Sequence, residues 1–137
     1  MTFEIFLNFN DGKCRAATEF YAAVFKSSVE NITLFSDAPD NPAYPIEESE
    51  RGRIMYATVK IADKNIMFMD MASSYPVVMG NNIMPAINVS DHAEIDRLFR
   101  ELRDGGAVIM APQKTFFSDY YTMLTDKFGI TWQIFVP

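Results

Sequence analysis

Few side chains in this sequence are of the types that carry acid–base or nucleophilic chemistry, and they lie far apart. Glu4 falls on a predicted strand and is a candidate general base if it is buried. Cys14 lies near the start of a predicted helix, which favours a thiolate, but no histidine or second cysteine accompanies it, so packing is its expected role. His92, the single histidine, falls in the first turn of another predicted helix, where we expect an exposed capping role.

Two tyrosines that could donate hydrogen bonds to a ligand belong to an internal repeat. Tyr56 and Tyr121 lie 65 positions apart, each in a stretch of alternating residues that a turn connects to a second such stretch. A second correspondence, at 80 positions, relates residues 6–11 to residues 86–91. A half-unit of this size cannot bury a core alone, so the two copies are expected to share a sheet, with any pocket between them.

The elements expected around these residues repeat the order β-α-β-β-β. In the first copy the periodicities predict strands at 3–9, 29–35, 53–62 and 65–71 and a helix with an apolar stripe from Ala17 to Phe25. In the second copy they predict strands at 83–89, 108–113, 117–125 and 130–136 and a helix that starts at Asp91, with a stripe from Ile95 to Leu102. Pro112 makes the 108–113 strand an edge strand or a short one.

Two segments lie outside the repeat. Residues 36–52 hold three prolines and five acidic residues, which predicts a long surface loop or lid. Residues 73–81 are the expected linker between modules 1–72 and 82–137, which together form a single domain, 1–137.

The composition limits the kinds of partner. A net charge of −6 with no run of Lys or Arg lacks the attraction to phosphate on which nucleic-acid binding depends, and it favours small molecules or cations. The single cysteine excludes an internal disulfide and fits a reducing compartment. No apolar run approaches the roughly 20 residues of a membrane span, and residues 1–12 lack the pattern of a signal peptide. We therefore expect a cytoplasmic protein with neither a nucleic-acid nor a membrane partner.

The paired units resemble a known superfamily. With Phe20-Tyr21 in the first helix and Asp126, Gly129 and Gln133 near the end, they resemble the vicinal oxygen chelate proteins, which include glyoxalases, fosfomycin and bleomycin resistance proteins and extradiol dioxygenases. Residues 6–10, 13–21 and 125–134 are similar to the PhnB-like branch, often labelled 3-demethylubiquinone-9 3-methyltransferase-like. The resemblance implies an α+β fold of two βαβββ modules, with a cupped mixed sheet and the helices outside.

A methyltransferase activity does not fit the turn after the first strand. Conventional methyltransferases hold a nucleotide-like cofactor on a Gly-rich turn of a doubly wound sheet. Here that position reads Asn10-Asp11-Gly12-Lys13, without the G-x-G-x-x-G spacing. We therefore expect no such cofactor.

The resemblance also implies where a metal would bind. Metal-using relatives take His or Glu ligands from the first and last strands of each half, and these positions correspond here to Glu4, Phe68, Met84 and Gln133. Of these, only Glu4 suits a hard divalent ion. We expect no tightly bound metal.

Strand alternation predicts which side chains line the cup. If Ile5, Leu7 and Phe9 face the helices, the lining comprises Glu4, Phe6, Asn8, Tyr56, Thr58, Lys60, Phe68, Asp70, Met84, Ala86, Asn88, Tyr121, Met123, Thr131, Gln133 and Phe135. A mostly apolar lining with a few polar groups is typical of a small-molecule site. The alternative is that these side chains fill the cup as a second core, because methionine packs readily into irregular space.

Three functions remain open on this basis. The first is a small-molecule-binding protein that sequesters or senses a cationic or amphipathic ligand. The second is an isomerase or lyase in which Glu4 is the base and Asn8 and Gln133 orient a substrate oxygen. The third is a structural or interaction module with a filled cup. In each case we expect a homodimer, because open sheets leave edges that a partner covers.

Overall fold

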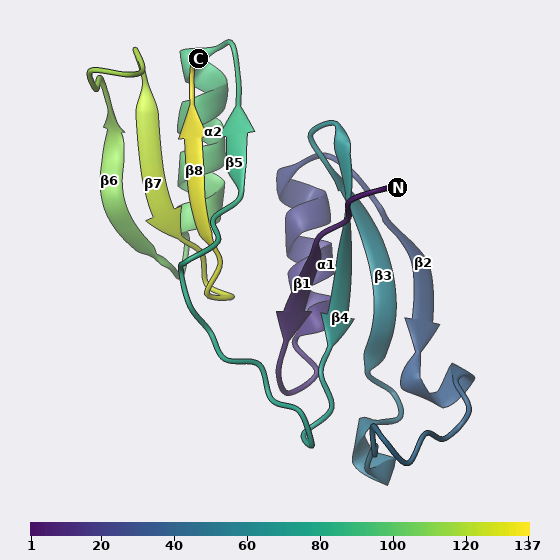
Figure 1. Cartoon of the computed structure of the whole chain (residues 1–137). Coiled ribbons are helices and arrows are strands. Elements are labelled where there is room, and N and C mark those ends of the chain that lie inside the picture. The colour runs from purple at the N-terminus through teal and green to yellow at the C-terminus, as the bar shows by residue number, and fades with distance from the viewer. The chain divides into compact units, whose positions relative to one another are not determined.

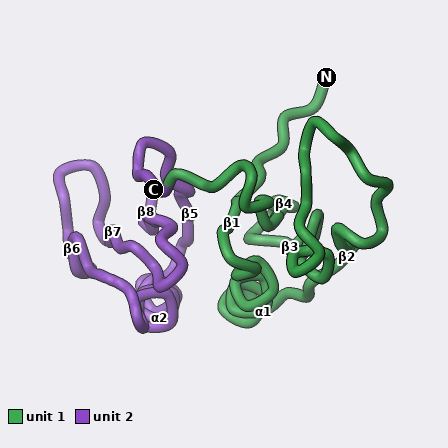
Figure 2. The backbone as a smooth tube through the Cα atoms, turned by 90° about the horizontal axis from the view of Figure 1, so that it is seen from below, with its two compact units in different colours: residues 1–78 green, residues 79–137 purple.

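The predicted β-α-β-β-β order occurs twice in the computed structural model, which describes residues 1–137 (Figure 1). The chain divides into two compact units, Met1–Val78 and Met79–Pro137 (Figure 2). The division falls within residues 73–81, the segment expected to be the linker. Each unit holds one four-stranded mixed sheet and one helix that packs on it, so the predicted α+β class is confirmed. The expectation that the two copies share one sheet was wrong, because the strands of each copy pair only with one another.

The first unit contains β1 (Phe6–Phe9), α1 (Cys14–Val24), β2 (Val29–Leu34), β3 (Ile54–Ile61) and β4 (Lys64–Asp70). Its sheet has the order β1-β4-β3-β2, in which β1 and β4 run parallel and the other pairs are antiparallel. Strands β3 and β4 form the predicted hairpin. The predicted acidic loop contains the short 3₁₀ turn Glu48–Glu50, while another, Phe35–Asp37, begins at the last residue of the strand predicted over 29–35.

The second unit contains β5 (Ala86–Asn88), α2 (His92–Arg103), β6 (Ala107–Gln113), β7 (Tyr121–Thr125) and β8 (Thr131–Phe135). Its sheet has the order β5-β8-β7-β6, so β6 is an edge strand, as Pro112 predicted. Strand β5 is shorter than expected, because Pro85 has no N–H to donate to a ladder and β5 begins only after it. Helix α2 starts after Asp91, whose carboxylate accepts the Ala93 N–H at 2.9 Å.

The core of the first unit lies between α1 and the sheet. Tyr21 of α1 is fully buried, and its ring stacks on that of Phe68 in β4, with the centroids 5.7 Å apart. The Phe68 ring also stacks on Phe9 of β1 at 6.3 Å. Ala57 and Val59 of β3 are fully buried as well. Such burial contributes about 1.5–3 kcal/mol per large apolar side chain, which fixes α1 on this face of the sheet.

The core of the second unit is built in the same way. Ile95, Leu98 and Leu102 form the buried stripe of α2, at the spacing that predicted a helix. Trp132 of β8 is also buried, and its Nε1 donates to the Asp126 carboxylate at 2.8 Å. The indole therefore contributes its apolar area without leaving a buried donor unpaired.

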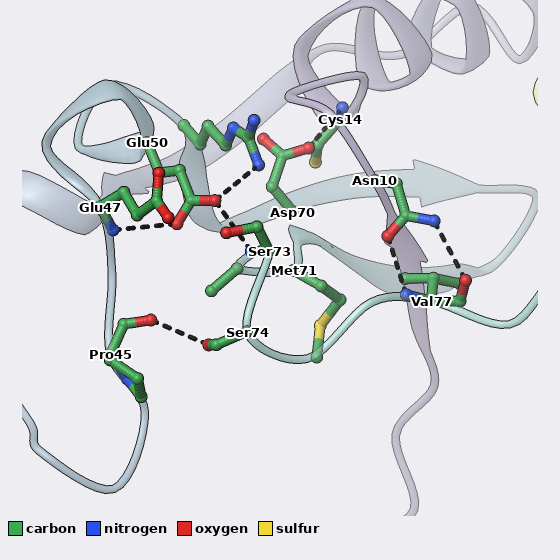
Figure 3. A network of polar contacts seen from close by, with 12 residues as sticks. Asn10, Cys14, Pro45, Glu47, Glu50, Asp70, Met71, Ser73, Ser74 and Val77 are labelled. Atoms are coloured by element: carbon green, nitrogen blue, oxygen red, sulfur yellow. Dashed lines mark hydrogen bonds and ion pairs between the residues drawn. The ribbon is translucent and has the colours of Figure 1, made fainter.

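A buried carboxylate joins three elements of the first unit. Asp70, at the end of β4, accepts the Cys14 N–H at the start of α1 at 2.9 Å (Figure 3). It also accepts the Ile54 N–H of β3 at 3.0 Å. Burial raises the pKa of Asp70, and these two hydrogen bonds and the charge of Arg53 oppose that rise. The carboxylate caps the helix from a neighbouring strand, so it sets where α1 begins relative to the sheet.

Asp70→Ala is expected to lower the free energy of unfolding by about 1–3 kcal/mol, because two buried N–H groups lose their acceptor. The control is Asp63→Ala, which removes an exposed carboxylate paired only with Lys64 and is expected to cost less than about 0.5 kcal/mol. Urea denaturation of both variants measures the difference. Equal stabilities of the two variants would show that Asp70 is not a structural cap.

Candidate functional site

Each sheet packs its helix on one face, the helix face, and we call the opposite side the far face. In the first unit, register places Phe6 and Asn8 of β1 beside Met67 and Met69 of β4. Thr58 of β3 pairs with Met67, and its hydroxyl lies 3.6 Å from the Met67 sulfur. These residues share the far face, as the alternation of β1 and β3 predicted.

Aromatic rings extend this surface. The ring of Phe6 lies 6.1 Å from that of Tyr56 on β3, tilted by 58°. Four of the side chains predicted for the site in the first module, namely Phe6, Asn8, Tyr56 and Thr58, therefore gather on one surface of rings and thioethers. Such a surface is apolar and holds few hydrogen-bonding groups, which is typical of small-molecule sites.

One polar atom on this face has no partner. The Asn8 Oδ1 is buried, and no donor lies within hydrogen-bond distance of it. Leaving a buried acceptor unpaired costs about 1–3 kcal/mol. Unpaired buried atoms of this kind are uncommon in folded proteins and need an explanation.

The far face of the second unit carries the other predicted residues. Register places Asn88 beside Phe135, Phe135 beside Tyr121, and Gln133 beside Met123. The Tyr121 hydroxyl donates to the Gln133 Oε1 at 2.8 Å, and burial raises the pKa of Tyr121. The Tyr121 ring also contacts Phe117 edge-on at 5.0 Å. The five predicted residues of these strands thus lie on one surface.

Two side chains predicted for the cup instead face a helix. Phe68 stacks on Tyr21, and Asp70 binds the Cys14 N–H, so both lie on the helix face of β4. The prediction was wrong because it carried the 65-residue correspondence of β3 and β7 through to β4 and β8. Register instead pairs Phe6 with Met67 as Ala86 pairs with Gln133, so Met67 is the counterpart of Gln133.

The slip arises in the hairpin turn of the second unit. In the first hairpin Thr58 pairs with Met67, and in the second Met123 pairs with Gln133. The segment that connects the two paired residues is one residue longer in the second hairpin. Asp126 organises the longer turn by accepting the N–H groups of Phe128 and Ile130, and Gly129 adopts a φ of +90° that favours glycine. A shift of one residue exchanges the two faces of a strand.

The remaining predicted residues lie outside the strands. Glu4 is exposed in the segment before β1, and Met84 is half-buried in the segment before β5. Neither is held by strand pairing of its own. The structure therefore brings together nine of the twelve predicted side chains, as two groups, one on each far face. Phe68 lies on the helix face, and Glu4 and Met84 lie outside the strands.

The four positions that the sequence predicted as counterparts of metal ligands do not form a hard-ligand set. Glu4 is exposed, Phe68 packs on α1, Met84 offers a thioether, and the Gln133 oxygen accepts from Tyr121. No group of three or more His, Cys, Asp and Glu side chains is arranged to hold a metal ion. These donors do not suit the oxygen-rich coordination of a divalent catalytic ion.

The single cysteine and the single histidine both contact side chains or backbone groups that hold the fold together. Cys14 is fully buried at the start of α1, and burial raises the pKa of its thiol, so the thiolate is disfavoured. His92 stacks on Tyr120 with the ring centroids 4.5 Å apart, in the first turn of α2. The Tyr120 hydroxyl donates to Asp96 at 2.6 Å.

Sequence reasoning did not find a second concave surface in the first unit. A pocket of about 650 Å³ lies under the acidic loop, and Met55, Met69 and Met71 line it together with residues of the loop. A signal was available, because Met69 and Met71 lie two positions apart and so project to the same side of β4 and its extension.

Two βαβββ units, each a mixed sheet with a helix on one face, give the fold that the resemblance to the vicinal oxygen chelate proteins implied. Similar solved structures include the PhnB protein from Bacillus cereus, with a TM-score of 0.80 and 24% identity over 100% of both chains. Protein PA1353 from Pseudomonas aeruginosa has a TM-score of 0.83 and 27% identity over 98% of both chains. The fosfomycin resistance protein FosX from Listeria monocytogenes has a TM-score of 0.65 and 12% identity, over 99% of this chain and 92% of that one.

A family model described as 3-demethylubiquinone-9 3-methyltransferase matches residues 2–135, and the chain belongs to this PhnB-like family. The protein YjdN of Escherichia coli K12 is 28% identical over 130 residues, which cover 90% of this chain and 87% of that protein. The activity in the family's description does not follow from this fold, since neither mixed sheet is doubly wound and no Gly-rich turn follows β1. Neither helix is long and apolar enough to cross a membrane.

Divalent metals are expected to leave the stability unchanged, because Met84 and Gln133 stand at ligand positions. A ligand that does not bind the native state cannot stabilise it. The melting temperature should be the same, within error, with EDTA and with added Zn²⁺, Mn²⁺ or Ni²⁺. A rise of several degrees with one ion would contradict this prediction.

Cys14 is expected to be unreactive in the folded protein, because it is buried and its thiol pKa is raised. A thiol reagent such as DTNB should modify native protein at least about 100-fold more slowly than guanidinium-denatured protein. Cys14→Ser serves as the blank. Rapid stoichiometric labelling under native conditions would instead place the thiol within reach of solvent.

Proposed function

We propose that this chain is a small-molecule-binding protein and that the far face of a sheet supplies the groups that contact the ligand. The observation that carries this proposal is the Asn8 Oδ1, which is buried beside apolar side chains and has no donor. A ligand N–H or O–H would satisfy that oxygen and recover the free energy that the unpaired acceptor costs the free protein. The surrounding rings and thioethers would contact the apolar part of the same molecule.

The far face of the second unit supports the same function. Because the Gln133 Oε1 already accepts from Tyr121, the amide is oriented with its Nε2 hydrogens available as donors. Asn8 in one unit thus offers an acceptor and Gln133 in the other offers donors, each within an apolar surface. A few oriented polar groups in an apolar lining give a small-molecule site its specificity.

The net charge of −6 favours a ligand that is cationic or amphipathic. The position of Glu4 gives no support to an isomerase or lyase mechanism, because a general base must lie within hydrogen-bond reach of its proton and Glu4 is exposed before β1. A filled second core is the competing interpretation, since Tyr121 and Gln133 already satisfy each other.

Replacing Asn8 by leucine distinguishes a binding site from a second core. Asn8→Leu removes the unpaired acceptor, so the free energy of unfolding is expected to stay equal or rise by up to about 1–3 kcal/mol. The same change should abolish the binding of small molecules found by thermal-shift screening, or retained in native mass spectra of the wild-type protein. Gain of stability with loss of binding is the pattern expected of a functional residue.

The control is Asn81→Leu, which changes an exposed asparagine that belongs to neither sheet and should leave binding unchanged. If Asn8→Leu lowers stability and the wild-type protein retains no small molecule, the far face is a second core and the proposal fails.

A further inference from the structure

The pocket under the acidic loop is lined by residues of that loop as well as by residues of the sheet. Its walls include Phe35, Asp40 and Tyr44 on the loop side and Met55, Met69 and Met71 on the sheet side, and we call it the loop pocket. Its volume of about 650 Å³ lies in the range of sites for organic molecules, about 300–1,000 Å³. Asn8, Tyr121 and Gln133 do not line it, but Met69, the neighbour of Asn8 in the register of β1 and β4, belongs to both surfaces.

Hydrogen bonds hold the loop against the end of β4. The Tyr44 hydroxyl accepts the Ala72 N–H at 2.8 Å and lies 3.9 Å from the Met71 sulfur, to which it can donate. The Ser74 hydroxyl donates to the Pro45 carbonyl at 2.9 Å (Figure 3). Two separate bonds thus connect the loop to residues 72–74.

A buried carboxylate completes this anchoring. Glu50 accepts the Ser73 N–H at 2.8 Å and the Glu47 N–H at 3.1 Å, and Arg53 pairs with it at 3.5 Å (Figure 3). The hydrogen bonds from Ser73 lower the pKa of Glu50, so the carboxylate remains charged at neutral pH. These contacts hold the loop in place without a ligand, so ligand binding would not carry the entropy cost of ordering it.

The lining selects one chemical class. Three thioethers and the rings of Phe35 and Tyr44, whose centroids lie 6.3 Å apart, form an apolar and polarizable surface. The lining includes one carboxylate, Asp40, and no lysine or arginine. Aromatic faces and a carboxylate both attract a cation, whereas no positively charged side chain lines the pocket to bind an anion.

We propose that the loop pocket binds a small organic ammonium, a molecule with an apolar or aromatic body and a protonated amine. The body packs on the methionines and rings, and the amine lies towards Asp40. Arg51 pairs with Asp40 at 3.3 Å, but the Asp40 side chain is 90% exposed, so water screens the pair and a ligand amine can compete with it. The site would act in addition to the far faces.

Tryptamine and indolepropionate test the proposal, because they share an indole body and carry opposite charges. With ¹³C-methyl-labelled methionine, tryptamine is expected to shift the NMR signals of Met55, Met69 and Met71. Its Kd should be roughly three- to five-fold lower than that of indolepropionate, the size expected for one exposed charge interaction. Equal affinities would overturn the ammonium preference.

Matched variants test the role of Asp40. Asp40→Asn should weaken tryptamine binding by roughly three-fold, whereas Asp63→Asn, which removes an equally exposed carboxylate paired with Lys64 at 3.3 Å, should not change it. Ala38→Trp places a large ring in the pocket wall and should abolish the three methyl shifts while leaving the other methyl signals in place.

The methionines also separate this site from the proposed function, since Met67 and Met123 report on the far faces. If tryptamine shifts Met67 or Met123 and leaves Met55 and Met71 unmoved, the amine binds a far face and the loop pocket is not its site. Absence of any methyl shift would also overturn this inference, while leaving the result for Asn8→Leu unaffected.

Discussion

A four-stranded sheet has two faces, and in each unit of this protein a single helix covers only one of them. That constraint governs the rest of the structure. On the helix face the sequence supplies large apolar side chains such as Tyr21, Phe68 and Trp132, which bury fully and stabilise the unit. On the far face it supplies a mixture of rings, thioethers and amides, which makes a poorer core and is the surface that we propose for ligands. The two faces therefore differ because alternate residues of each strand differ in type.

The Asp70 carboxylate shows how the helix face is fixed in place. It is buried at a cost, because its charge is taken out of water, and the hydrogen bonds to Cys14 and Ile54 offset that cost. The second unit has a related device in Asp126, which binds the Trp132 indole and two N–H groups of its own turn. Each unit thus relies on a carboxylate at a strand end to set the geometry around it.

Periodicity predicted the type and order of the elements because the helix and strand periods differ clearly over stretches such as Ile95–Leu102. It also predicted the far-face positions of Asn8, Tyr56, Tyr121 and Gln133, since alternation within one strand is independent of everything outside it. The position of Phe68 could not be predicted in this way. It was inferred across a turn, and one extra residue in the Asp126–Gly129 turn reversed the face. The loop pocket could not be predicted from periodicity either. Its walls come from segments far apart in the sequence, and hydrogen bonds such as that between Tyr44 and Ala72 bring them together.

The methionines of the loop pocket also make that surface chemically changeable. Oxidation of a thioether gives a sulfoxide, which is polar and accepts hydrogen bonds strongly. Met55 is 37% exposed, so a small oxidant can reach this wall without unfolding the protein. A single oxygen atom added to Met55 would place a polar group in a mostly apolar lining. The oxidation history of the protein would then decide which molecules this pocket accepts, while the helix-face cores, built almost without sulfur, would keep the fold unchanged.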